Sequence, residues 1–193
     1  MDLAGRTAGT DPGSPSDSEL LTALIGGDRR WAWSILVARY SPKMYAVARS
    51  FRLNEQTAED LVQTAWLRLI ERVGQLRDPD AVGPWLCMIV RNEARRLVTR
   101  QREIPSVLIL EHRPNSDALD TALLNAERAG VLRAALATLG SQCQQLLRLL
   151  IAEPPLSYDE IAAALGRPRG SLGPTRRRCL DQLRLALPTD LEP

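Results

Sequence analysis

Apolar residues recur every three to four positions along most of this chain, which is the period of a helix with one buried face. Leu and Ala dominate these positions, and both are good helix formers, whereas alternating runs of β-branched residues are scarce. The chain is therefore expected to be all-α. The pattern predicts helices over residues 18–25, 28–51, 57–73, 85–101, 132–151 (as one helix or two), 157–165 and 171–187.

Prolines and polar runs divide this helical pattern. Ser41-Pro42 lies inside the second stretch, where we expect a kink or two abutting helices. Residues 1–17 are rich in Gly, Ser, Asp and Thr, a composition typical of disorder. Residues 103–128 hold two prolines and carry five acidic residues against two arginines. The sequence thus predicts two small helical domains, 18–102 and 129–188, joined by an extended acidic linker.

Two helical stretches supply most of the predicted core of the first domain. The stretch over 28–51 is expected to bury Trp31, Ile35, Leu36, Tyr40, Tyr45, Val47 and Phe51. The next helix opens with Thr57 and Asp60 and is expected to bury Leu61, Val62, Ala65, Trp66, Leu69 and Ile70.

Residues 157–187 predict two short helices joined by a tight turn. Ser157 and Glu160 form the S-x-x-E pattern in which each side chain caps the other residue's backbone amide. Gly166 suits a left-handed helix end, and Pro174 suits a first helical turn. Six arginines against three acidic residues give the one-sided charge that phosphate binding needs. The segment is either a DNA-binding helix-turn-helix or an amphipathic hairpin with a solvated arginine face.

A second basic helix lies in the first domain. Its predicted span, 85–102, carries five arginines and one acidic residue. A basic helix face is often only solvated surface, but two basic surfaces on two domains favour one nucleic acid held at two points. Trp85 begins the apolar stripe of this helix, which favours a core position over a base-stacking platform.

Charge and composition narrow the function further. The net charge is only +2, so the local grouping of basic residues matters more than the total. All of them except Lys43 are arginine, which suits phosphate and guanine contacts but also follows from a GC-rich genome. Cys87, Cys143 and Cys179 lie in apolar contexts without a C-x-x-C pattern and are expected to be buried thiols in a reducing cytosol.

The sequence lacks the patterns of secreted, membrane-spanning and catalytic proteins. It shows no signal peptide and no apolar run of the ~20 residues that span a bilayer, so a cytoplasmic protein without membrane contact is expected. His112, the one histidine, lies in the predicted linker without a partner, and neither a Gly-rich phosphate loop nor paired carboxylates are present. We expect no enzyme activity, no metal and no cofactor.

Three segments resemble the bacterial sigma-70 family of RNA polymerase sigma factors, especially its extracytoplasmic-function (ECF) group. AEDLVQTAWLRL (58–69) and DPDAVGPWLCMIVRNEARRL (78–97) look like sigma domain 2, and SYDEIAAALGRPRGSLGPTRRRCL (157–180) looks like the promoter-binding helix-turn-helix of domain 4. The resemblance covers roughly residues 18–101 and 129–187, in the order and spacing of the family. Residues 103–128 leave no room for the middle domain of housekeeping sigma factors, which marks the ECF group.

The resemblance implies partners and roles position by position. The partners are core RNA polymerase (β′ clamp helices and β flap), double- and single-stranded promoter DNA, and an anti-sigma factor as a further candidate; the location is the nucleoid-associated cytoplasm. Core binding is implied for Asp60, Leu61, Gln63, Arg68 and Glu71, although Asp60 could instead cap its own helix. Recognition and opening of the minus-ten element is implied for Arg77, Asp80, Trp85, Arg91, Asn92, Arg95 and Arg96. Recognition of the minus-thirty-five element is implied for Arg169, Ser171, Thr175, Arg176, Arg177 and Arg178.

The chain departs from the commoner family pattern at Gly173-Pro174-Thr175, where many members place basic or serine residues. A proline there narrows which side chains reach base edges. The implied function is an alternative sigma factor that directs core polymerase to specific promoters and opens them. The alternative is a stand-alone helix-turn-helix regulator, which would have no need of the AEDLVQ helix or of the basic helix over 85–102.

Overall fold

The computed structural model describes residues 14–27, 29–103 and 121–187, and it describes the side chains of all of these except 101–103 and 121–128. All regular elements within these ranges are helical, so the all-α prediction is confirmed. Most of the segment predicted to be disordered (1–17) and most of the predicted acidic linker lie outside the described residues. The disorder prediction is wrong at the end of its segment, because Ser16 caps α1 and Asp17 begins it. Among the described helices, none is long and apolar enough to cross a membrane.

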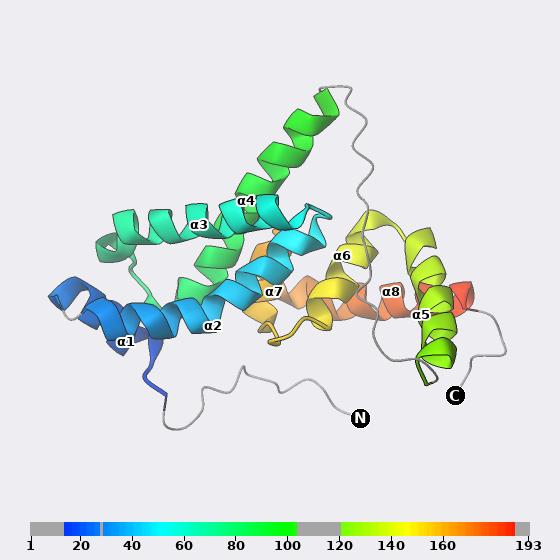
Figure 1. The fold of residues 1–193 in the computed structure, drawn as a ribbon, viewed down its shortest axis with the longest axis horizontal. Helices are drawn as coiled ribbons and strands as arrows, with labels where there is room; N and C mark the ends of the chain where they lie inside the picture. The colour runs from blue at the N-terminus through cyan, green and yellow to red at the C-terminus, as the bar shows by residue number, and fades with distance from the viewer. Residues whose placement is uncertain (1–13, 28, 104–120, 188–193) are drawn as a thin grey trace.

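The helices form two groups along the chain (Figure 1). The N-terminal unit comprises α1 (Asp17–Gly26), α2 (Arg29–Ser50), α3 (Glu55–Arg72), the 3-10 turns η1 (Val73–Gln75) and η2 (Pro79–Ala81), and α4 (Val82–Glu103). The C-terminal unit comprises α5 (Thr121–Thr138), α6 (Ser141–Leu150), α7 (Tyr158–Leu165), the 3-10 turn η3 (Arg169–Ser171) and α8 (Leu172–Ala186). Helix α5 starts inside the segment predicted as linker.

Helix α2 runs without a break through Pro42, where two abutting helices were one of the expected forms. A proline inside a helix removes one backbone hydrogen bond, so tertiary contacts must hold the helix together there. Tyr40, Lys43 and Met44 are all buried around this point. The indole Nε1 of Trp66 in α3 also donates a 3.1 Å hydrogen bond to Ser41 Oγ. Packing against the neighbouring helices therefore outweighs the local cost of the proline.

The start of α3 is capped by Asn54 rather than by the predicted pair at residues 57 and 60. The Asn54 side chain accepts a 2.8 Å hydrogen bond from the backbone N–H of Thr57. Leu61, Val62, Ala65, Trp66 and Leu69 are buried as predicted. The prediction is wrong for Ile70, which is 57% exposed, and for Trp31 in α2, which is 39% exposed.

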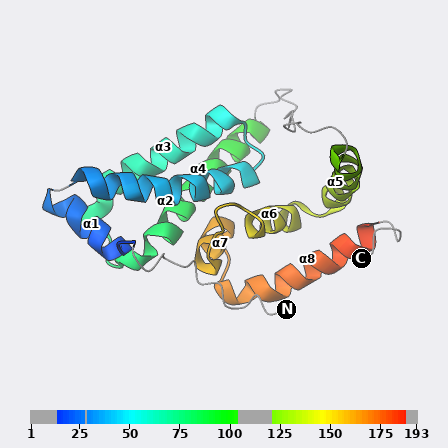
Figure 2. The same ribbon diagram turned by 60° about the horizontal axis from the view of Figure 1, so that its bottom comes forward.

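The two units pack against each other through helices far apart in the sequence. Figures 1 and 2 show α7 beside the first half of α4, while α6 contacts α2. A single cluster of buried apolar side chains runs through both units, from Leu20 in α1 to Cys179 in α8. Helix α5 and the end of α8 extend away from the N-terminal unit in both views.

A buried ion pair crosses this interface. The ammonium of Lys43, on α2, lies 2.9 Å and 3.1 Å from the two carboxylate oxygens of Glu160, on α7. Lys43 is 8% exposed and Glu160 is 3% exposed. Glu160 also accepts a 2.7 Å hydrogen bond from the backbone N–H of Ser157, which completes the predicted capping box of α7. The Glu160 carboxylate therefore both caps α7 and pairs this helix with α2 of the other unit.

The expectation of three buried thiols is wrong for two of them. Cys143 on α6 and Cys179 on α8 form a disulfide, with their Cα atoms 5.3 Å apart. The sequence could not indicate this pairing, because it depends on where two helices cross and not on the spacing of the cysteines along the chain. Cys87 is a buried free thiol as expected, and burial raises its pKa.

Replacing Lys43 with Met should destabilise the fold, because it leaves the Glu160 carboxylate buried without a counter-charge. Breaking one half of a buried pair costs about 3–5 kcal/mol, and less where the charge can escape into water. The double variant Lys43→Met/Glu160→Gln should recover most of the loss, because glutamine preserves the capping box. Denaturant unfolding followed by circular dichroism measures both. Equal stability of wild type and Lys43→Met would contradict the role of the pair.

Candidate nucleic-acid interface

The outer face of α3 presents polar and apolar side chains together. Asp60, Gln63 and Glu71 are exposed, and helical spacing places them on one side with two large apolar residues. Those two, Leu67 and Ile70, are 60% and 57% exposed. Exposed apolar residues grouped with polar ones are typical of a protein-binding surface. The sequence analysis did not single out Leu67 and assigned Ile70 to the core. Helical spacing from Asp60 and Gln63 would have placed both residues on the polar side.

Two further residues predicted to bind a partner through α3 are engaged within the unit. Leu61 is 4% exposed and packs in the core, so in this arrangement it does not reach the surface. The guanidinium of Arg68 is 2.5 Å from a carboxylate oxygen of Glu93 on α4. Arg68 therefore ties α3 to α4.

The loop before α4 projects polar side chains beside the basic helix. Asp78 accepts a 3.1 Å hydrogen bond from the backbone N–H of Asp80, and Pro79 follows directly, so the turn η2 is locally fixed. Arg77 and Asp80 are exposed. Trp85 is half-buried and packs against the core, which agrees with the predicted core position.

Helix α4 carries its predicted DNA-contacting residues in different environments. Arg95 and Arg96 are exposed, and Arg96 lies 3.1 Å from Glu93. Asn92 is half-buried, and its side-chain oxygen accepts a 2.9 Å hydrogen bond from Arg91. Burial, and then the neighbouring positive charge of Arg95, lower the pKa of Arg91. The α4 face therefore concentrates positive charge that carboxylates only partly balance.

The helix-turn-helix has the predicted local chemistry, with one extra element in its turn. Gly166 adopts a φ of +64° at the end of α7, a conformation that favours glycine. The 3-10 turn η3 then precedes α8, which begins at Leu172 with Pro174 in its first turn. Helix α8 thus starts one residue later than predicted.

The predicted recognition residues lie on η3 and α8 and divide into engaged and free side chains. Arg169 lies 2.8 Å from Asp159, and Arg176 donates a 3.4 Å hydrogen bond to the Tyr158 hydroxyl. The hydroxyls of Ser171 and Thr175 donate to backbone carbonyls of Pro168 and Ser171, both at 2.7 Å. Arg177 and Arg178 are exposed. These last two are the side chains most accessible to a ligand.

The predicted DNA-contacting face of α4 lies partly at the interface between the units. A Cβ atom on Gly166 would lie 2.1 Å from Nη2 of Arg91, so the turn after α7 sits directly on the α4 arginine. A cleft of about 210 Å³ beside this contact is lined by Arg91 and Arg95 of α4 and by Thr175 of α8. In this closed arrangement the C-terminal unit covers part of the basic face of α4.

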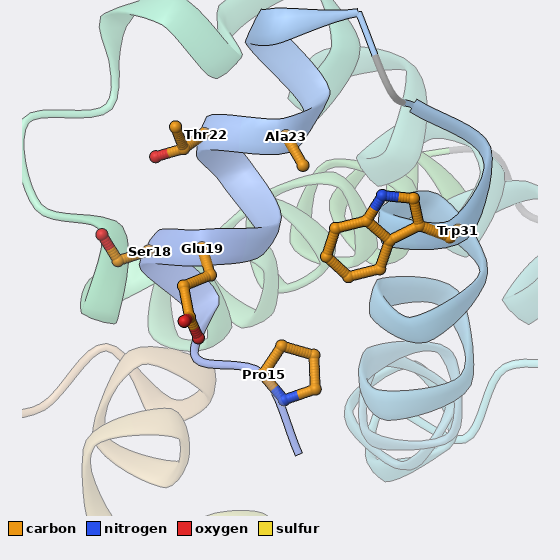
Figure 3. Close-up of a pocket in the computed structure, with 6 residues that line it drawn as sticks. All are labelled: Pro15, Ser18, Glu19, Thr22, Ala23 and Trp31. Atoms are coloured by element: carbon orange, nitrogen blue, oxygen red, sulfur yellow. The ribbon is translucent and has the colours of Figure 1, made fainter. Parts of the chain in front are cut away.

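The rest of the described structure offers no further candidate for a chemical site. A shallow hollow of about 480 Å³ between α1 and the start of α2 is lined by Pro15, Ser18, Glu19, Thr22, Ala23 and Trp31 (Figure 3). It has no basic side chain, and Glu19 is engaged in the capping box of α1. Within the described ranges no group of three or more His, Cys, Asp or Glu is placed to hold a metal ion.

Known proteins are similar to this chain over most of its length. Residues 36–104 match the family Sigma-70 region 2. The RNA polymerase sigma-H factor of Pseudomonas aeruginosa is 31% identical over 166 residues, which cover 81% of this chain and 86% of the relative. The ECF RNA polymerase sigma factor SigE of Mycolicibacterium smegmatis is 30% identical over 178 residues, which cover 88% and 68%.

Solved structures show the same fold. CnrH in complex with the cytosolic domain of CnrY matches with a TM-score of 0.58 at 23% identity, over 89% of this chain and 96% of that one. The sigma factor RpoE of Bartonella quintana, in complex with the anti-sigma factor NepR, matches with a TM-score of 0.53 at 24% identity, over 80% and 95%.

Replacing Gly83 with Ala should loosen the contact between the units. A Cβ at this position, in the first turn of α4, would lie 2.7 Å from Glu160 Oε1 and from Tyr40 Cε1. We expect a larger radius of gyration by small-angle X-ray scattering than for wild type. Gly130→Ala on α5 is the matched control, because nothing lies within 4 Å of its Cβ. A Gly83→Ala protein as compact as the control would contradict the tight packing.

Proposed function

Because this chain belongs to the ECF group of sigma-70 family RNA polymerase sigma factors, we propose that its two helical units share promoter recognition. Sigma factors are non-catalytic subunits that direct RNA polymerase to promoters, and this chain is an alternative sigma factor of that kind. This division of roles rests on one observation, which is that each unit has its own basic surface, on α4 and on α8. The stand-alone regulator is not favoured, since the relatives match across both units.

The proposed polymerase-docking surface is the outer face of α3. Asp60, Gln63 and Glu71 would supply polar contacts there, and Leu67 with Ile70 would supply apolar ones. Asn54 already caps this helix, so Asp60 is not needed for capping and is available to a partner. Arg68 would act indirectly, by holding α3 against α4 through Glu93. The partner in this proposal is the clamp-helix region of the polymerase β′ subunit.

The proposed site for the minus-ten element consists of the loop before α4 and the basic face of α4. Arg77 and Asp80 project from the loop, and Asn92, Arg95 and Arg96 lie along the helix. Extracting a base from the stack costs a few kcal/mol, which a pocket recovers by hydrogen-bonding the base edge. The Asn92 amide can make such bonds once it is released from Arg91.

The proposed site for the minus-thirty-five element is the exposed side of α8. Arg177 and Arg178 point to solvent, and Arg176 lies next to them. Arginine reads guanine with two parallel hydrogen bonds in the major groove. Arg169 and Ser171 would position the turn on the DNA backbone, as would Thr175.

Promoter binding in this proposal requires the closed arrangement to open, because the turn after α7 rests on Arg91. An anti-sigma factor is a natural antagonist of that opening. The solved relatives with the same fold were captured with the cytosolic domain of CnrY and with the anti-sigma factor NepR. We extend this class of partner to the present chain, together with the nucleoid-associated cytoplasm as its place of action.

Core polymerase supplemented with this chain should give specific run-off transcripts on a promoter library, and core polymerase alone should give none. In the variant Asp60→Ala/Gln63→Ala, we expect core affinity to fall about tenfold or more, a loss of about 1.4 kcal/mol or more, because both side chains lie on the proposed docking face. Affinity is measured by titration of labelled sigma factor with core polymerase.

The matched control is Ser18→Ala/Thr22→Ala, which removes two exposed polar side chains from α1. Both variants should retain the helical circular dichroism of the wild type. Full core affinity in Asp60→Ala/Gln63→Ala would contradict the docking assignment.

Charge reversal at Arg176 and Arg178 should abolish protection of the upstream promoter element in the holoenzyme. Asn92→Ala should leave that protection in place and reduce permanganate reactivity of the minus-ten thymines, because Asn92 lies on the other unit, on the helix that follows the loop proposed to hold an unpaired base. DNase I and permanganate footprints on one promoter distinguish the two effects. An Asn92→Ala holoenzyme that opens DNA normally would count against the base-reading role.

A further inference from the structure

We propose that the cleft between the two units binds a small phosphate-bearing anion, and that this ligand stabilises the closed arrangement. The cleft measures about 210 Å³ and lies between α4, α6, the turn after α7 and the start of α8. The polar side chains that line it come from both units and are Arg91, Arg95, Gln142, Gln145, Arg167 and Thr175.

The positive charge of the cleft favours binding of an anion. Three guanidinium groups line it, and no carboxylate does. The nearby acidic side chains are engaged elsewhere, since Glu160 pairs with Lys43 and Glu93 with Arg68. Burial, and then the like charge of Arg95, lower the pKa of Arg91, so a second positive charge lies close to this guanidinium. A bound anion would remove this repulsion.

Positive charge continues along the same interface. Arg148 of α6 has its pKa lowered by burial and then by Arg52, which lies just beyond the end of α2. Arg52 in turn donates to the Gln144 side chain. The contact between α2 and α6 is therefore also electropositive.

The hydrogen-bond donors of the cleft suit phosphate oxygens. Arg95 makes no hydrogen bond or ion pair with another described residue, so its guanidinium is available. Arg167 donates to the Gln142 side-chain oxygen, which leaves the Gln142 amide nitrogen and the remaining Arg167 N–H groups for a ligand. Arginine binds phosphate with paired, charge-assisted hydrogen bonds, stronger than those of neutral groups.

The size of the cleft limits what can enter. Sites for drug-sized ligands measure about 300–1,000 Å³, so this cleft fits a phosphate or diphosphate group with the rest of a larger molecule outside. The same chemistry has two sources, a small phosphate compound and the backbone of a nucleic acid. We assign the site to the small compound, because in the closed arrangement the cleft is walled by α6 and α8, which a long strand would have to pass.

The ligand would act by linkage. A molecule that contacts both units binds the closed arrangement and not the open one, and so shifts the population toward the closed one. Arg91 and Arg95 would then be withheld from promoter DNA. This regulatory consequence rests on the proposed function, whereas the binding itself does not.

Isothermal titration calorimetry of this chain, without polymerase or promoter, tests the site. Pyrophosphate is titrated into the protein, and sodium chloride at the same ionic strength is the control titration. We expect saturable one-to-one binding of pyrophosphate. Arg167→Gln and, separately, the exposed Arg95→Gln should each weaken it at least tenfold. Arg30→Gln, which removes an exposed arginine at the start of α2, is the matched control and should bind as wild type.

A second measurement distinguishes the two sources and reads out closure. Hydrogen exchange of α7 should slow with pyrophosphate in the wild type and not in Arg95→Gln. The proposal is overturned if pyrophosphate shows no saturable binding, or if both cleft variants bind it as tightly as the control does. It is also overturned if the Arg95-dependent slowing of exchange appears only with a single-stranded oligonucleotide. Because no polymerase is present, failure here leaves the run-off and footprinting outcomes untouched.

Discussion

The buried ion pair between Lys43 and Glu160 is the interaction on which the arrangement of the two units depends. Its partners lie 117 positions apart in sequence, and both are almost completely shielded from water. Such a pair adds little to stability in absolute terms, but it makes separation of only one partner costly. Glu160 also caps α7, so the start of the helix-turn-helix and its contact with α2 share one carboxylate. Local folding and domain packing are thereby coupled.

Packing of the two units leaves some of the proposed binding surfaces accessible and covers others. The outer face of α3 and the exposed arginines of α8 are accessible while the units are packed together. Part of the basic face of α4 is covered, because the turn after α7 rests on Arg91. In the proposed function, polymerase can therefore dock on α3 before the minus-ten surface is free. The positive charge collected at the interface makes the closed arrangement sensitive to anions.

Local sequence signals predicted the local structure well. The capping box at Ser157, the glycine that ends α7 and the basic residues of α4 and α8 follow from residue types within a few positions of one another. Contacts between distant helices did not follow from the sequence. The Cys143–Cys179 disulfide, the Lys43–Glu160 pair and the continuity of α2 through Pro42 depend on how helices cross. The exposure of Ile70 likewise depends on which face α4 covers, so helical period alone misassigned it.

A distance measurement between the units tests the central claim most directly. Spin labels carried by non-natural amino acids at Arg30 on α2 and Arg184 on α8 leave the cysteines untouched, and both positions are exposed. Double electron–electron resonance should give one narrow distance distribution in the free protein. A longer distance should replace it when core polymerase and promoter DNA are bound. A broad distribution in the free protein, or the same distance in both states, would contradict a closed arrangement that opens for promoter recognition.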